Sequence, residues 1–341
     1  MYEIKNRTIH KDGEPWFMVG IYYVSHKRAE QRKLLERIEE IAEAGFNTLF
    51  TPIQADSLSA KILDACAENG MAVVVEDNTS WEEIKRKHGN HPAIAFPQVV
   101  DDANRVPGIP RKEWNELSFT EKKSLVDLRI FDRIQEIQQH YPTPSNVQYL
   151  SVGASEESMQ LVEDWPAMIK GYQFYNTLSD LTAIYTMSRR ARELSVEPRS
   201  VLLPIVQAYQ YDGERWPNIA ELEAMAWLSL MSGAKGLAFY TAYDGANDMW
   251  DRMHGIEAVK TIVTRLEPYK AAILNSEELI CTFDTWGIFN AIWSSEKSGT
   301  LEVTTDVVTN FPTSFASLTL PDPLSSVSNE ALLKELAKRL G

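Results

Sequence analysis

Two short apolar stretches decide the fold: residues 201–209, VLLPIVQAY, and residues 234–240, AKGLAFY. Each stretch has the length of a short strand and consists almost entirely of apolar residues, as a strand buried on both faces requires. Polar or aromatic residues follow each stretch. An amphipathic helix is predicted between them, from Ile219 to Ser232. Because a strand–helix–strand unit joins two parallel strands, its repetition along the chain predicts a barrel whose strand ends carry the chemistry.

The same alternation of apolar strand and amphipathic helix occurs throughout the first four fifths of the chain. The other six predicted strands are Phe17–Tyr23, Phe46–Ile53, Met71–Val75, 91–100, Val147–Val152 and Met168–Phe174. The other predicted helices are Arg28–Ala44, Ser57–Asn69, Ser80–Lys87, Thr120–His140, Ser179–Leu194 and Gly255–Leu274. Eight alternations within about 270 residues predict an α/β protein with a (β/α)8 barrel fold. A doubly wound open sheet is the alternative, but no glycine-rich phosphate loop follows the first strand.

Segments at both ends of the barrel are predicted to be antiparallel. Residues 1–15 alternate polar and apolar and turn at KDGE, residues 11–14, which predicts a hairpin that closes the bottom of the barrel. Beyond Asn275 short alternating segments predict a small antiparallel β region, followed by a helix or tail at Asn329–Leu340. We therefore expect a barrel domain with its hairpin over residues 1–275, and a small β region with a C-terminal helix over residues 276–341.

The composition favours a globular protein that binds neutral ligands. The chain has 341 residues, of which 44% are hydrophobic and 24% charged, enough for a large core. Its formal net charge is −14, with 48 acidic and 34 basic residues and no basic cluster. Binding of nucleic acid or of an anionic membrane depends on clustered positive charge, so neither partner is expected.

Few residues have the chemistry of a disulfide, a metal site or a targeting signal. Two cysteines, Cys66 and Cys281, are too few for a disulfide framework or a structural zinc site. His88 and His91 have no third ligand near them, so we expect no metal, and no cofactor motif is present. Residues 1–7, MYEIKNR, do not resemble a secretory signal. A cytoplasmic location is therefore expected, with an extracellular or virion-associated location as the alternative.

Acidic residues follow several of the predicted strands. The carboxyl ends of the strands in a parallel barrel share one mouth, so their side chains are expected to gather there. Two carboxylates about 5 to 9.5 Å apart can cleave a glycosidic bond, one of them as the general acid. We predict Asp102 as the acid, Glu156 or Asp244 as the opposing carboxylate, and Asp101 and Glu76 as substrate contacts. The alternative for each carboxylate is a cap or hydrogen-bond partner within its loop.

Aromatic residues are predicted at the same end of the barrel. Their flat faces suit the apolar C–H faces of sugar rings, and nearby polar groups suit sugar hydroxyls. The alternative for any one of them is a place in the core or at the rim. The predicted substrate contacts of this kind are Tyr22, Tyr175, Tyr209, Tyr240 and Trp250, with Gln207, Tyr175 and Tyr240 orienting hydroxyls.

Four segments of the predicted barrel carry motifs of known enzymes: HKDGEPWFMVG at residues 10–20, AGFNT at 44–48, HPAI at 91–94 with DDAN at 101–104, and residues 204–243. In this order they resemble the hairpin that leads into the first strand, the second strand, the fourth strand, and the seventh and eighth strands of the clan A glycoside hydrolases, a superfamily of TIM-barrel glycosidases. The resemblance covers residues 8–275 and implies a TIM barrel that acts on carbohydrate.

The resemblance also assigns roles to two positions. Clan A enzymes place an acid/base glutamate after the fourth strand and a nucleophilic glutamate after the seventh, where this chain has Asp102 and Gln207. An amide cannot serve as the nucleophile of a retaining mechanism. Three alternatives follow: another carboxylate, Glu156 or Asp244, replaces it, the enzyme inverts by using water, or the barrel only binds glycans. The last describes a non-catalytic carbohydrate-binding or structural barrel, for instance in a virion or surface assembly.

Overall fold

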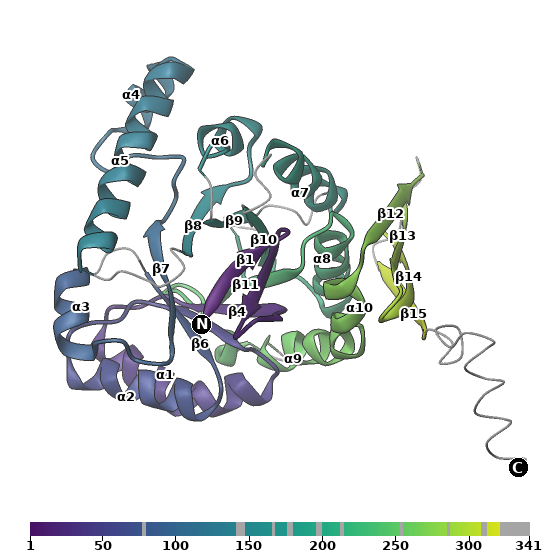
Figure 1. The fold of residues 1–341 in the computed structure, drawn as a ribbon, viewed down its shortest axis with the longest axis horizontal. Helices are drawn as coiled ribbons and strands as arrows, with labels where there is room; N and C mark the ends of the chain where they lie inside the picture. Colours follow the sequence, from purple (N-terminus) through teal and green to yellow (C-terminus); the bar gives the residue numbers. More distant parts are fainter. Residues whose placement is uncertain are drawn as a thin grey trace, which may run out of the picture.

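Eight parallel strands close into a barrel surrounded by helices (Figure 1). The computed structural model describes residues 1–76, 80–140, 147–165, 168–175, 180–195, 200–211, 215–252, 255–284, 287–307 and 312–320. Around the barrel, each strand lies beside its neighbour in sequence, and the eighth closes on the first. The strands in chain order are β4 (Met18–Tyr23), β5 (Thr48–Thr51), β6 (Ala72–Val75), β7 (Ile94–Val100), β8 (Gln148–Gly153), β9 (Met168–Phe174), β10 (Val201–Gln207) and β11 (Gly236–Tyr243). The predicted (β/α)8 fold is confirmed.

Most of the helices were predicted, but two short ones were not. The unpredicted helices are α4 (Arg111–Glu116), inside the polar segment after the fourth strand, and α6 (Glu156–Leu161), directly after the fifth. Both have six residues, too few to show a helical period in the sequence. The remaining helices are α1 (Arg28–Glu43), α2 (Ser57–Glu68), α3 (Trp81–His88), α5 (Phe119–His140), α7 (Thr182–Leu194), α8 (Ile219–Met231), α9 (Gly255–Leu266) and α10 (Lys270–Asn275), with 3-10 turns η1 (Met249–Asp251) and η2 (Glu267–Tyr269).

Each barrel strand is buried on both faces, and its side chains alternate between two apolar layers. In β10, Val201, Leu203 and Ile205 belong to the cluster that fills the barrel interior, whereas Leu202 and Val206 belong to the cluster under the helices. This is the period of two that a strand imposes, with both faces covered. The alternation explains why the strands are continuous apolar stretches in the sequence.

The N-terminal segment forms a three-stranded antiparallel sheet at the bottom of the barrel. Its strands are β1 (Tyr2–Lys5), β2 (Thr8–Lys11) and the two-residue β3 (Glu14–Pro15), one strand more than the predicted hairpin. Ile9 of β2 is buried with the residues of the barrel interior, and the Tyr2 ring lies 4.8 Å from that of Phe96 in β7. The sheet therefore extends the inner apolar cluster beyond the barrel strands.

The C-terminal segment forms the predicted small antiparallel sheet. Its four strands are β12 (Glu278–Phe283), β13 (Ile288–Ser295), β14 (Gly299–Asp306) and β15 (Thr313–Thr319), and the sheet lies beside α8 and α10 (Figure 1). One face joins the outer apolar cluster, with the rings of Trp293 and Trp227 of α8 6.4 Å apart. The predicted helix at Asn329–Leu340 lies outside the described residues, and the domain boundary at residue 275 stays a prediction.

Replacing Ile9 by alanine tests whether the N-terminal sheet belongs to the core. Ile9 is 3% exposed, so the Ile9→Ala variant should lose about 2–5 kcal/mol of unfolding free energy through lost burial and the cavity left behind. Urea denaturation monitored by circular dichroism measures this. The matched control is Ile280→Ala at a side chain that is 49% exposed, expected within about 0.5 kcal/mol of the unmodified chain. Equal losses for both variants would contradict this account.

Candidate functional site

Every second side chain of a barrel strand points inward, and these side chains are here called the inward row of that strand. The last residues of the inward rows form the mouth of the barrel. Glu76 continues the inward row of β6, Tyr175 that of β9, and Tyr240 follows the inward-facing Ala238 in β11. Tyr22 likewise lies at the end of the inward row of β4. Because the strands are parallel, these row ends meet at one end of the barrel. The alternation of side chains along each strand therefore fills the core and also places the side chains of the mouth.

These row ends and the loops after them line a cavity of about 490 Å³, here called the mouth cavity. Cavities of about 300–1,000 Å³ are typical of sites for small molecules. Eight of the predicted site residues line it: Glu76, Asp101, Asp102 and Asp244 among the acids, and Tyr22, Tyr175, Tyr209 and Tyr240 among the tyrosines. The other lining residues are Val24, Asn104, Arg105, Gly153, Gln173 and Tyr211.

Tyrosine rings form one side of the mouth cavity as a contiguous cluster. The ring of Tyr175 lies 5.2 Å from that of Tyr209 and 5.4 Å from that of Tyr240. Tyr22 lies 5.3 Å from Tyr240 and stacks on Phe50 below it at 4.3 Å. Rings at these distances and tilts support one another. The cluster thus presents rigid aromatic faces and several hydroxyl groups to the cavity.

Burial keeps these hydroxyl groups protonated far above neutral pH. Burial raises the pKa of Tyr22 and Tyr175 well above the usual value of 10, and the nearby Asp101 carboxylate acts in the same direction. The pKa of Tyr240 is also raised, first by burial and then by the charge of Asp244. The hydroxyl of Tyr22 is hydrogen bonded to that of Tyr149, whose pKa burial raises as well. The cluster is therefore a set of neutral donors and acceptors, as sugar hydroxyls require.

Asp101 and Asp102 occupy a turn that β8 and β9 hold from the side. Ser151 of β8 donates to the Asp101 carboxylate and accepts from the backbone N–H of Asp102 at 3.1 Å. Gln173 of β9 donates to Oδ1 of Asp102 at 3.0 Å. Asp102 has a positive φ of 45°, an uncommon conformation that aspartate tolerates better than most residues. Within the described residues Oδ2 of Asp102 carries no hydrogen bond, so one oxygen of this exposed carboxylate keeps its acceptor capacity.

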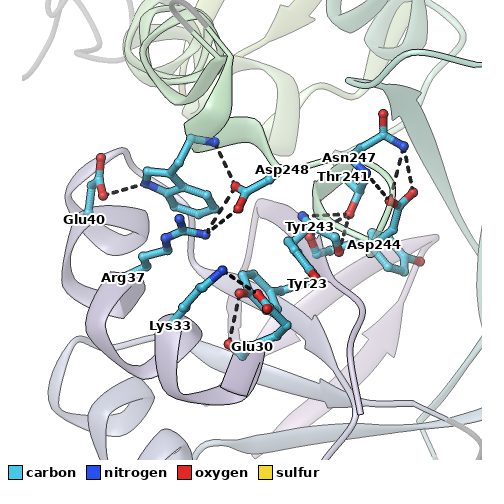
Figure 2. Close-up of polar contacts among 12 residues, drawn as sticks. Tyr23, Glu30, Lys33, Arg37, Glu40, Thr241, Tyr243, Asp244, Asn247 and Asp248 are labelled. Carbon is cyan, nitrogen blue, oxygen red and sulfur yellow. Dashed lines mark hydrogen bonds and ion pairs between the residues drawn. The ribbon is translucent and has the colours of Figure 1, made fainter. Parts of the chain in front are cut away.

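Asp244 approaches the mouth cavity from the opposite side. Its strand, β11, lies four positions from β7 in the eight-stranded ring, so Asp102 and Asp244 extend from diametrically opposed strands. Oδ1 of Asp244 accepts hydrogen bonds from the backbone N–H groups of Ala246 and Asn247 at 3.0 and 2.7 Å. The Asn247 amide contacts both carboxylate oxygens (Figure 2). Asp244 therefore shapes its own loop, while Oδ2 keeps acceptor capacity for a further partner.

The loop that carries Asp244 is fixed to α1 by charged residues. Figure 2 shows Arg37 of α1 reaching Asp248, whose two carboxylate oxygens lie 3.2 and 3.3 Å from the guanidinium. The same guanidinium lies 4.1 Å from the ring centre of Trp250, and the indole N–H of Trp250 donates to Glu40 at 2.7 Å. These contacts hold the 244–250 segment between α1 and the mouth.

Three predicted site residues do not line the mouth cavity. Glu156 begins α6, separated by two residues from the end of β8, and pairs with Arg190 of α7 at 2.7 Å outside the mouth cavity. Trp250 packs against Arg37 on the outside of β11. Gln207 is fully buried below the tyrosines, where its amide donates to the carbonyl oxygen of Tyr209 at 3.2 Å. The predictions of Glu156, Trp250 and Gln207 as contacts in the mouth are therefore corrected.

Three residues that build the site were not predicted. Ser151 and Gln173 position Asp101 and Asp102, and Arg105 lines the cavity. Ser151 continues the inward row that contains Tyr149, and Gln173 lies two residues before Tyr175, so strand alternation predicts this pair. Arg105 lies in a loop, where no sequence period applies.

Neither a metal cluster nor a membrane helix is found in the part of the chain that the structure describes. No group of three or more histidine, cysteine, aspartate or glutamate side chains is arranged there to hold a metal ion. No helix among these residues combines the length and the apolar character needed to cross a bilayer.

Comparison with known proteins places the fold among the TIM-barrel glycosidases. No protein-family model and no curated protein sequence matches the chain. A glycoside hydrolase family 5 structure from Bacteroides vulgatus is similar over 89% of this chain and 80% of its own, with a TM-score of 0.56 and 9% identity. The fold is that of these enzymes. At such identity the similarity shows the fold alone.

Two further structures match over most of their own length. A GH5 cellulase from an Icelandic hot spring isolate aligns over 77% of this chain and 93% of its own, with a TM-score of 0.54 and 12% identity. An endo-1,4-beta-mannanase from Rhizomucor miehei aligns over 78% and 99%, with a TM-score of 0.53 and 10% identity. Similarity of fold does not determine function, so function has to be argued from the residues of the mouth.

The raised pKa values predict how the protein responds to alkali. The folded state keeps Tyr22, Tyr149 and Tyr175 protonated, whereas the unfolded chain releases these protons near pH 10. The free energy of unfolding should therefore be unaffected by these groups below about pH 10 and should fall as the pH rises above it. Absorbance at 295 nm should show a group of tyrosines that ionise only on unfolding. Ionisation of all 13 tyrosines near pH 10 in the folded protein would contradict this.

Removing Asp248 tests the attachment of the 244–250 segment to α1. Asp248→Ala removes two charge-assisted contacts with Arg37, so we expect a loss of about 1.5–3 kcal/mol in unfolding free energy. Urea titration provides the measurement. As the control, Lys33→Ala removes the ion pair of an exposed lysine with Glu30 and should cost less than about 1 kcal/mol. A smaller loss for Asp248→Ala than for Lys33→Ala would show that the segment does not depend on this contact.

Proposed function

We propose that the chain is a glycoside hydrolase whose barrel mouth binds an oligo- or polysaccharide. The observation that carries this proposal is the mouth cavity itself, which combines a cluster of neutral tyrosines with four carboxylates. The tyrosine faces match the C–H faces of sugar rings, and the carboxylates and hydroxyls match the hydroxyl groups at the ring edges. The fold shared with TIM-barrel glycosidases supports the same conclusion.

Asp102 and Asp244 are the proposed catalytic pair. They reach one cavity from opposed strands, as two groups must if they are to flank a single bond. Asp102 transfers its proton to the glycosidic oxygen as the bond between that oxygen and the anomeric carbon breaks. Asp244 accepts a proton from the water whose oxygen joins the anomeric carbon on the other face. One water is consumed, and the anomeric configuration inverts.

Gln207 is the reason for proposing inversion. It occupies the end of the seventh barrel strand, and an amide provides no nucleophile for a covalent glycosyl intermediate. Direct attack by water needs a base and not a nucleophile, so the proposed mechanism does not involve Gln207. The amide of Gln207 instead donates a hydrogen bond to the backbone carbonyl oxygen of Tyr209.

A carbohydrate-binding protein without hydrolytic activity is the second candidate. The observation that favours it is the engagement of Asp244, whose carboxylate accepts three hydrogen-bonding groups from its own loop. In this alternative Tyr175, Tyr209 and the carboxylates would contact a glycan without cleaving it. Both candidates require saccharide binding in the mouth cavity.

Substitution of Asp102 separates the two candidates. With a panel of neutral oligosaccharides, the unmodified protein should release reducing ends, and Asp102→Asn should lower kcat by about 10²–10⁴-fold because the proton donor is lost. The control Glu156→Gln removes a carboxylate outside the mouth and should stay within about twofold. Proton NMR of the first-formed anomer tests inversion. Unchanged hydrolysis by Asp102→Asn would rule out its role, and binding without any hydrolysis would favour the second candidate.

A further inference from the structure

A second cavity, here called the side cavity, adjoins the mouth cavity. It has a volume of about 530 Å³ and shares Asp101, Asp102, Asn104 and Arg105 with the mouth cavity. The proposed acid, Asp102, thus lies on the boundary between the two. A saccharide cleaved at Asp102 has sugar units on both sides of the broken bond, and the side cavity provides space for those on one side.

The side cavity is built by the segment between β7 and α5, residues 101–118, which contains α4. Arg129 of α5 fixes the start of this segment, because its guanidinium donates to the carbonyl oxygens of Asp101 at 3.0 Å and Asp102 at 3.3 Å. Glu157 at the edge of the cavity pairs with Lys122 at 2.7 Å. The cavity therefore has an ordered base, and its glutamate is already neutralised.

Two arginines of this segment have no hydrogen-bond or ion-pair partner for their guanidinium groups among the described residues, unlike Arg129. Arg105 and Arg111 both line the side cavity, and both are exposed. Among the residues that the structure describes, neither guanidinium forms a hydrogen bond or an ion pair. Trp114, half-buried, adds an aromatic surface to the same cavity. In a chain with a net charge of −14, these two arginines place positive charge beside one tryptophan, in a cavity that Asp101 and Asp102 also line.

We propose that the side cavity binds a sugar unit that carries an anionic group, such as a uronate carboxylate or a sulfate ester. Arg105 and Arg111 bind the anion through the paired N–H groups that guanidinium offers to planar or tetrahedral oxyanions, and Trp114 contacts the sugar face. This inference rests on the proposed function. It departs from the expectation of neutral ligands drawn from net charge, because three arginines, Arg105, Arg111 and Arg129, line the side cavity, and one of its three carboxylates, Glu157, is paired with Lys122.

Matched saccharides test the proposal. Neutral hexasaccharides of β-1,4-linked glucose and mannose are compared with their C6-oxidised uronate counterparts and with sulfated forms by isothermal titration calorimetry. An anionic form should bind at least about tenfold more tightly than its neutral counterpart, and the difference should shrink as salt is added. Whether the uronate or the sulfate binds more tightly identifies the anionic group.

Arg111→Gln should abolish the preference for the anionic form and leave the affinity for the neutral form unchanged. The matched control is Lys112→Gln, which removes the same charge from the same short helix at a residue that does not line the cavity. This control should keep the preference. Arg105→Gln should weaken the preference as Arg111→Gln does.

Two results overturn the inference, and they differ in what they say about the proposed function. Equal affinity for neutral and anionic forms, or equal effects of Arg111→Gln and Lys112→Gln, would contradict the anionic site while leaving the saccharide-binding mouth in place. No binding of any saccharide, neutral or anionic, would contradict both proposals.

Discussion

The closed ring of parallel strands is the constraint on which the rest of the structure depends. Closing the ring buries every strand on both faces, so side chains must alternate between an inner and an outer apolar layer. The inner rows fill the barrel with residues such as Leu203 and Phe50 and end at Glu76, Tyr175 and Tyr240. The core and the mouth are therefore formed by successive residues of the same inward-facing rows of side chains. The Tyr22 ring, stacked on Phe50, shows this continuity, because its lower face belongs to the core while its edge lines the cavity.

The acidic residues of the mouth combine structural and chemical roles. Ser151 and Gln173 hold the turn at Asp101 and Asp102 from neighbouring strands, and Asn247 holds Asp244 within its own loop. Such supporting hydrogen bonds limit the positions that a carboxylate can take, as the proposed cleavage of one bond by two carboxylates requires. Each of the proposed catalytic carboxylates still has an oxygen with remaining acceptor capacity.

The mouth and the side cavity differ in their chemistry although they share a wall. Asp101, Asp102 and Arg105 line both cavities, whereas the tyrosines line only the first, and Arg111 and Trp114 line only the second. The barrel strands build the mouth, and the segment after β7 builds the side cavity. Similarity of fold at 9–12% identity does not extend to the residues that line these two cavities.

The barrel, the N-terminal antiparallel segment and the C-terminal sheet could be predicted from the sequence, because they depend on apolar periods that each segment carries locally. Most of the mouth could be predicted as well, since the residue after a buried parallel strand must lie at the shared end. The positions of Glu156, Trp250 and Gln207 outside the mouth cavity depend on tertiary contacts. Glu156 is turned outward to Arg190 and Trp250 packs against Arg37, both on helices distant in the sequence, and Gln207 is covered by Tyr209 and its neighbours. Folding brings these partners together. Contacts with them determine where the side chains in loops and at the ends of the inward rows point, whereas the spacing of residues along the chain does not.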